Sequence, residues 1–126
     1  MAKILVVDDD ETLASIVADC LREAHHTVSV CLDSSTAEAE ILSYKPDLAV
    51  IDYQMPGKTG VQLLADLRAN ASTKLLPVLF LSATEAVRFA GQVPPEPRAR
   101  FLRKPVDKKE LLIMVKEMLD PEGWSS

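Results

Sequence analysis

The chain has 126 residues, 48% of them hydrophobic, which is the size of one domain and excludes an intrinsically disordered protein. Its net charge of −5 argues against direct nucleic-acid binding, which requires a basic surface that releases counterions from phosphates. The apolar runs are too short for a transmembrane helix or a secretory signal, so we expect a cytoplasmic protein without membrane contact. The two cysteines, Cys20 and Cys31, lack metal-binding spacing and are expected to be small buried hydrophobic residues.

Five short apolar runs are predicted to be strands, and they alternate with segments of helical periodicity. The runs cover residues 3–7, 27–32, 47–51, 77–81 and 100–102. Continuous apolar runs of this length are typical of strands buried on both faces of a parallel sheet. Strands that alternate with helices form right-handed βαβ units, and five such units predict an α/β sandwich of three layers.

The segments between these runs carry apolar residues three or four positions apart, as amphipathic helices do. The stripes are Leu13, Ile16, Val17, Cys20, Leu21 and Ala24 in the first segment, Val61, Leu64, Ala65 and Arg68 in the third, and Leu111, Leu112, Val115, Met118 and Leu119 in the last. Asp33, Ser34 and Ser35 offer an N-cap for the second helix, which is expected to end near Tyr44, before Pro46. Asp107 and Glu110 resemble a capping box at the start of the last helix.

A fourth helix is expected after the fourth strand, but Pro94, Pro95 and Pro97 lie in its second half. Proline in a helix interior costs about 3 kcal/mol, so this helix is predicted to be short, over residues 84–91, and to be followed by an extended loop. Residues 1–120 are predicted to form one domain. Residues 121–126 are predicted to be a flexible tail or the start of a linker.

Acidic, hydroxyl and amino side chains follow the predicted strands at the points where these end. Asp8 and Asp9 follow the first strand, Asp52 the third, Ser82 the fourth and Lys104 the fifth. The carboxyl ends of parallel strands share one edge of a sheet, where ligands bind in open α/β folds, so we expect these five side chains to meet there. Each alone has an ordinary explanation as a turn or helix-cap residue, but capping does not explain their joint placement at four strand ends.

Three carboxylates in one crevice predict a bound cation. Each like-charge pair at about 4 Å costs about 4 kcal/mol at an effective dielectric of about 20, and protonation or a cation relieves this cost. Acids without His or Cys favour Mg²⁺, whose open positions suit phosphate oxygens. A carboxylate oxygen is also a nucleophile toward phosphorus, and a lysine and a hydroxyl can hold the other phosphoryl oxygens. The set therefore predicts phosphoryl chemistry on an aspartate.

These residues, in their order and spacing, resemble the receiver domain of two-component response regulators, including the stand-alone chemotaxis type. The resemblance covers residue 3 to about residue 119 and is carried by VVDD at residues 6–9, IDYQMP at 51–56 with Gly60, LSA at 81–83 and FLRKP at 101–105. It implies a flavodoxin-like fold with strand order 2-1-3-4-5. It also implies a signalling phosphoacceptor, not an enzyme, that takes the phosphoryl group from a sensor histidine kinase or a phosphotransfer protein.

The resemblance assigns the acceptor and the metal site. Asp52 is the expected phosphoacceptor. Asp8, Asp9, Asp52 and the backbone carbonyl of Gln54 are the expected ligands of Mg²⁺.

The resemblance also assigns the groups around the phosphoryl site. Ser82 and Lys104 are expected to hold the phosphoryl group, and the peptide bond between Lys104 and Pro105 is expected to be cis. Ser82 and Phe101 match the switch pair of the family, in which the hydroxyl moves toward the phosphoryl group and the aromatic ring turns inward.

One segment departs from the family pattern. Residues 94–99 carry three prolines where the family usually has a Gly-Ala turn after a full fourth helix. The face near this segment often serves as the output face. The sequence therefore leaves open how the domain contacts its output partner or effector domain, and whether it forms a phosphorylation-dependent dimer.

Two other functions fit parts of the sequence. Residues 8–12 match the Asp-x-Asp-x-Thr signature of haloacid dehalogenase-like phosphatases, with Asp8 as the nucleophile, but this hypothesis gives Asp52 no role and lacks the last metal-binding motif. The second alternative is an interaction module that keeps the receiver fold without using the phosphate. The intact acids and Lys104 argue against it, while the proline-rich segment keeps it open.

Overall fold

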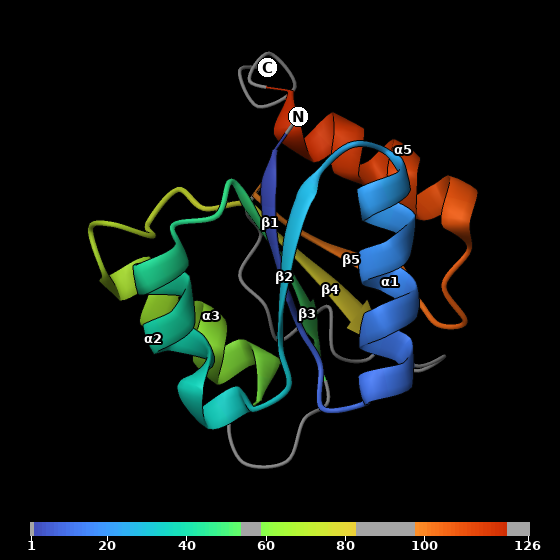
Figure 1. Cartoon of the computed structure of the whole chain (residues 1–126). Coiled ribbons are helices and arrows are strands. Elements are labelled where there is room, and N and C mark those ends of the chain that lie inside the picture. Colours follow the sequence, from blue (N-terminus) through green and yellow to red (C-terminus); the bar gives the residue numbers. More distant parts are fainter. Residues whose placement is uncertain (1, 54–58, 83–97, 121–126) are drawn as a thin grey trace.

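The computed structural model describes residues 2–53, 59–82 and 98–120 (Figure 1). Its elements are β1 (Lys3–Val7), α1 (Glu11–Glu23), β2 (Thr27–Cys31), α2 (Ser34–Tyr44), β3 (Leu48–Asp52), α3 (Gly60–Ala69), β4 (Val78–Ser82), β5 (Ala99–Arg103) and α5 (Lys108–Leu119). The bounds of β1 are those predicted, and each bound of the other strands lies within one residue of its predicted position. The predicted short helix over residues 84–91 and the proline-rich segment lie outside the described residues. Among the described residues, no helix has the length and hydrophobicity that a membrane-spanning helix needs.

The five strands form one parallel sheet in the order β2-β1-β3-β4-β5, which confirms the predicted topology. The neighbouring inner strands β1 and β3 pair in register from Ile4 with Leu48 to Val7 with Ile51. All strands therefore end at the same edge of the sheet. This edge is the lower one in Figure 1, where β1 and β3 point.

Helices cover both faces of the sheet, so the molecule has three layers (Figure 1). Successive strand residues point to opposite faces. Ile4 and Val6 pack with α1 and α5, whereas Leu5 and Val7 pack with α2 and α3. Both faces of the central strands are thus buried, which explains why their sequences are continuous apolar runs without alternation.

The buried stripes of two helices differ from the predicted ones. In α1 the buried residues are Ala14, Val17, Ala18 and Leu21, while Ile16 is 53% exposed. In α3 the buried residues include Leu63, Leu64 and Leu67, and the predicted Ala65 is exposed. In α1 the prediction selected the large apolar side chains, whereas two alanines, Ala14 and Ala18, are among the residues that the helix buries. In α5 the predicted stripe is confirmed, with Leu111, Val115 and Met118 buried.

Side-chain caps fix where the helices begin. Asp33 accepts a hydrogen bond from the Ser35 backbone N–H at 2.9 Å, and Asp107 accepts one from Glu110 N–H at 3.0 Å, which confirms both predicted starts. Asp10 caps α1 in the same way. Since Asp10 satisfies the helix terminus, the two acids before it are free for another role.

Gly60 is the first residue of α3 and lies against two aromatic rings. A Cβ at this position would lie 2.8 Å from Tyr53 Cδ1 and 3.0 Å from Phe80 Cε1. The two rings pack edge to face, with centroids 5.4 Å apart, so neither ring can move away without disturbing the other. The glycine is therefore required by close packing.

We expect Gly60→Ala to lower the free energy of unfolding by about 1–3 kcal/mol, because the added methyl group overpacks this contact. Urea denaturation measures the change. The same substitution in a Phe80→Leu background should cost less, because the smaller side chain gives the methyl group room. An equal cost in both backgrounds would contradict the packing explanation.

Candidate functional site

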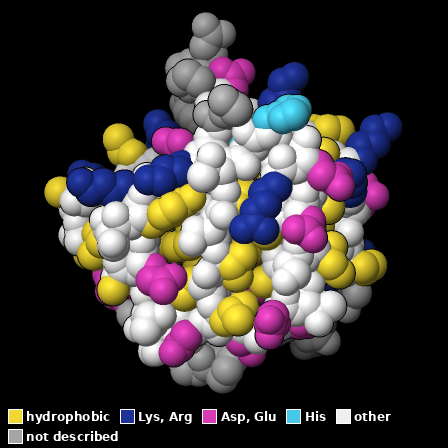
Figure 2. Space-filling model, viewed as in Figure 1, with side chains coloured by type: hydrophobic (Ala, Val, Ile, Leu, Met, Phe, Trp, Pro, Cys, Tyr) yellow, Lys and Arg dark blue, Asp and Glu magenta, His cyan; other side chains and the backbone are white. Residues whose placement is uncertain are grey.

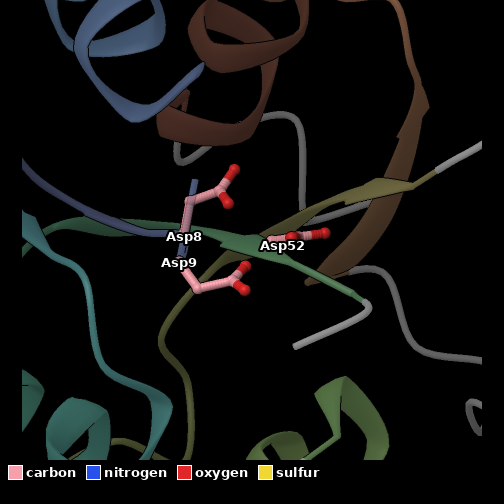
Figure 3. Close-up of side chains that lie close together, drawn as sticks. All are labelled: Asp8, Asp9 and Asp52. Carbon is pink, nitrogen blue, oxygen red and sulfur yellow. The ribbon is translucent and has the colours of Figure 1, made fainter. Parts of the chain in front are cut away.

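Three aspartates meet at the carboxyl edge of the sheet. Asp8 and Asp9 follow the last residue of β1, and Asp52 is the last residue of β3, the central strand. One carboxylate oxygen from each lies within 4.8 Å of the others. Figure 3 shows that the side chains of Asp8 and Asp9 leave the end of β1 in different directions and that both carboxylates lie beside Asp52. The structure thus confirms that these three acids converge.

Asp8 is the most constrained of the three acids. It is 1% exposed, and one of its oxygens, Oδ1, accepts a hydrogen bond from the Asp10 backbone N–H at 2.9 Å. The other oxygen, Oδ2, is buried and has no hydrogen-bond partner in the described part of the chain. Burial raises the pKa of Asp8 from its ordinary value of 3.8 to about 6, the Asp10 N–H opposes this shift, and the nearby Asp52 adds to it.

Lys104 reaches the acids from the end of β5. Its ammonium Nζ lies 3.1 Å from Asp52 Oδ1, although β5 is two strands away from β3. Its backbone N–H donates to the Ser82 carbonyl, and the peptide bond between Lys104 and Pro105 is cis, as expected. Asp52 is 4% exposed and the Lys104 side chain 27%, so the ion pair is largely shielded from solvent.

Ser82 completes the edge. It is the last residue of β4, next to β3 in the sheet, and it is 1% exposed. Its hydroxyl oxygen has no hydrogen-bond partner among the residues that the structure describes. A buried polar group without a partner is uncommon in folded proteins, because it costs about 1–3 kcal/mol. Asp8 Oδ2 and Ser82 Oγ are therefore both suited to an additional ligand.

Three aromatic rings lie beside the edge and form a cluster that the sequence did not reveal as a unit. Phe101 packs on Tyr53 and Phe80, with ring centroids 5.3 Å and 5.2 Å away. Tyr53 follows Asp52 directly, so the cluster is linked to the acid site through the backbone. The sequence identified Phe101 alone. The contacts of Tyr53 and Phe80 depend on strand register, which joins residues far apart in the chain. Gln54, the expected carbonyl ligand, lies outside the described residues.

A separate cleft, of about 860 Å³, lies at the end of the sheet where the strands begin. Its lining includes Ala2, His26, Asp47 and Leu119, and none of the site acids. It therefore belongs to a different part of the molecule from the acid cluster, and none of the site residues predicted from the sequence lines it.

The acid cluster fits a hard divalent cation. All of its donors are carboxylate oxygens, which is the donor type that Mg²⁺ and Ca²⁺ prefer. Mutual repulsion raises the free energy of the cluster, and the single Lys104 ammonium offsets only part of the negative charge. Asp8 Oδ2 supplies a buried oxygen with a free lone pair.

The match to a family model decides the class of protein. The model of the response regulator receiver domain matches residues 4–116, which is most of the chain. The chain belongs to the response regulator receiver domain family. It is a receiver domain of the two-component signalling type, and receiver domains are signalling phosphoacceptors generally not classed as enzymes.

Relatives and solved structures agree with this assignment. The phosphate regulon transcriptional regulatory protein PhoB of Rhizobium meliloti is 31% identical over 94% of this chain. The chemotaxis protein CheY of Pseudomonas aeruginosa is 40% identical over 64% of this chain and 66% of its own length. Among solved structures, chemotaxis protein CheY4 of Vibrio cholerae is 26% identical, with a TM-score of 0.80 over 94% of this chain and 98% of its own. The receiver domain of a Francisella response regulator is 30% identical, with a TM-score of 0.78 over 94% and 97%.

The chain spans about half the length of the PhoB relative, 52%, and 26% of the response regulator PleD of Caulobacter vibrioides. Receiver domains of response regulators interact with histidine kinases and output effectors. The family match supports neither the haloacid dehalogenase-like phosphatase nor a phosphate-independent interaction module. The phosphatase hypothesis also leaves unexplained the contact between Lys104 and Asp52 at the centre of the site.

Proposed function

We propose that this receiver domain accepts a phosphoryl group on Asp52 from the phosphohistidine of a sensor histidine kinase or a phosphotransfer protein. The observation that supports this most directly is the position of Asp52. Its carboxylate lies between the acid pair of β1 and the ammonium of Lys104, 3.1 Å from Nζ. Once a cation is bound by the acids, the Asp52 carboxylate has that cation on one side and the Lys104 ammonium on the other.

The proposed metal ligands are Asp8, Asp9, Asp52 and the carbonyl of Gln54. Bound Mg²⁺ would supply charge neutralisation for the phosphoryl oxygens and hold them near Asp52. The three carboxylates fit this ion by donor type and by mutual distance. Asp8 and Asp9 contribute through charge and position, and neither takes the phosphoryl group.

In the transfer step, an oxygen of the Asp52 carboxylate forms a bond to phosphorus while the bond from phosphorus to the histidine nitrogen of the donor breaks. The electron pair of the broken bond stays with the departing imidazole. Lys104 stabilises the negative charge on the phosphoryl oxygens, and the unpartnered hydroxyl of Ser82 donates a hydrogen bond to one of them. The product is an aspartyl phosphate.

The switch follows from the same groups. Once the phosphoryl group is present, the Ser82 hydroxyl gains the partner it lacks, which draws the end of β4 toward Asp52. Phe101, which is half-buried against Tyr53 and Phe80, then turns further inward and changes the surface beside β5. An output partner or effector domain binds the changed surface. The domain binds this partner either as a monomer or as a phosphorylation-dependent dimer. We place these events in the cytoplasm, and with no direct contact to nucleic acid or membrane.

Labelling with acetyl phosphate tests the acceptor. With Mg²⁺ present, intact-protein mass spectrometry should show one added phosphoryl group in the wild type and none in Asp52→Asn. The haloacid dehalogenase hypothesis predicts the opposite dependence, with labelling lost in Asp8→Asn and kept in Asp52→Asn. Undiminished labelling of Asp52→Asn would refute the assignment.

A further inference from the structure

The outer side of β2 is a free edge of the sheet. In the described structure β2 is the first strand of the order and pairs only with β1. Thr27 N–H donates to the Ala2 carbonyl and the Cys31 carbonyl accepts from Asp8 N–H, so the odd-numbered residues of β2 face β1. Backbone groups alternate sides along a strand. Val28 and Val30 therefore present their N–H and C=O groups outward, where another strand can pair with them.

This edge is weakly protected against pairing. The sequence of β2, TVSVC, has no charged residue, proline or bulge, and it pairs with β1 in continuous register over all five residues. The opposite edge strand, β5, carries Arg100 and Arg103. One side-chain contact shields β2: the Arg22 guanidinium donates to the Val28 carbonyl at 3.0 Å. Arg22 is about half exposed, so water can replace this contact at small cost.

A groove of about 600 Å³ runs beside the edge on the α2 side. Its lining includes four small side chains, which are Ser29 of β2 and Thr36, Ala39 and Ser43 of α2. The helix therefore does not cover the edge of β2. A strand added to β2 has room for its own side chains on this face.

Two opposite charges, Lys3 and Glu40, line the groove. Lys3 lies at the Thr27 end, since these residues pair in the sheet and the Lys3 ammonium sits 4.4 Å from the ring centre of Tyr44. Glu40 also lines the groove, one helical turn before Tyr44 in α2. Its carboxylate is close enough to the Cys31 thiol, at the end of β2, to add to the rise in the pKa of that thiol, which burial mainly causes. In Figure 2 the basic side chains lie mainly in the upper half of this face, whereas acidic side chains occur in both halves.

We infer that this edge pairs with the same edge of a second copy of the chain, antiparallel and around a two-fold axis near Ser29. Val28 then exchanges backbone hydrogen bonds with Val30 of the second copy, and the reverse pair forms by symmetry. An antiparallel arrangement brings Lys3 of each copy toward Glu40 of the other. This charge match is a property of the chain itself, and it favours a second copy over a strand from an unrelated protein.

The pairing is independent of the phosphoacceptor. It uses neither Asp52 nor a metal ion, and it lies at the opposite edge of the sheet from β5. Five residues of edge strand make a small interface, and interfaces below about 1,200 Å² are generally transient. The dimer is therefore expected at high protein concentration and weakens as salt screens the Lys3–Glu40 attraction.

Sedimentation velocity tests the inference with charge-reversed variants. The wild type, of 13.8 kDa, should shift from monomer to dimer between about 10 µM and about 1 mM, the affinity range of weak complexes. Lys3→Glu and Glu40→Lys should each remain monomeric at about 1 mM, because like charges then face each other. A mixture of these two variants, and the double variant alone, should dimerise again. Both positions are exposed, so these variants keep the fold.

Two further variants separate this interface from the signalling site. Val30→Pro removes one outward N–H without touching the pairing to β1 and should abolish the dimer. Asp52→Asn should dimerise as the wild type does, without Mg²⁺ or a phosphoryl donor. A wild type that stays monomeric at about 1 mM overturns the inference. So does a dimer that survives both single charge reversals.

Discussion

Replacing Asp8 with Asn should stabilise the metal-free domain by about 2–3 kcal/mol at pH 7.5. The folded protein holds the proton of Asp8 more tightly than the unfolded chain does, since burial raises its pKa from 3.8 to about 6. The contribution of protonated Asp8 to stability is therefore complete below pH 3.8 and is lost as the pH rises through about 6. Above that pH the wild type keeps a buried charge beside Asp52, whereas the amide of the Asp8→Asn variant is neutral at every pH.

Urea denaturation from pH 5 to pH 8 in the presence of a chelator measures this effect. The wild type should lose stability relative to Asp8→Asn as the pH rises, and the difference between the two should be smaller at pH 5 than at pH 8. Asp9→Asn is the matched control: Asp9 belongs to the same cluster but is exposed, so its removal should change stability less. Addition of Mg²⁺ should restore stability to the wild type more than to either variant. If Asp8→Asn is less stable than the wild type at pH 7.5, the charge of Asp8 in the wild type is already compensated, and the expected effect is contradicted.

Replacing Lys104 with Met should slow phosphorylation of Asp52 by about 100- to 1,000-fold, while Mg²⁺ binds more tightly. The ammonium, 3.1 Å from Asp52, stabilises phosphoryl oxygens during transfer, so its loss raises the barrier. The same ammonium repels a cation bound by the three acids. Removing it should increase Mg²⁺ affinity by about tenfold at the effective dielectric of a partly buried site.

Single-turnover labelling with acetyl phosphate and calorimetric titration with Mg²⁺ give the two readouts. Lys109→Met, on the exposed face of the first turn of α5, is the control and should change neither. Slower phosphorylation together with tighter Mg²⁺ binding distinguishes a direct role of Lys104 from misfolding. A misfolded site would both react more slowly and bind Mg²⁺ more weakly. Weaker Mg²⁺ binding by Lys104→Met would contradict the proposed arrangement.

The parallel sheet and the position of the acid site were both predictable from the sequence, because both depend on where the apolar runs begin and end. Continuous apolar runs mark strands buried on both faces, and parallel strands end at one edge. The polar residue that follows each run therefore had to lie at that edge. The joint position of Asp8, Asp52 and Lys104 follows from this rule, without knowledge of their distances.

Features that depend on close packing were not predictable in the same way. Apolar spacing identifies a helix, but it does not tell that Ala14 and Ala18 are buried while Ile16 is exposed, since the helix rotation depends on the sheet beneath it. The cluster of Tyr53, Phe80 and Phe101 and the free edge of β2 likewise arise from register between distant segments.

Three carboxylates at the ends of two strands are proposed to bind one divalent ion. Titration with Mn²⁺, an oxygen-seeking ion whose free form is measured by electron paramagnetic resonance, tests it most directly. The wild type should bind one Mn²⁺ per chain, displaced by Mg²⁺, and the triple variant in which Asp8, Asp9 and Asp52 are all replaced by Asn should bind none at this site. Equal stoichiometry and affinity in the wild type and the triple variant would contradict the account.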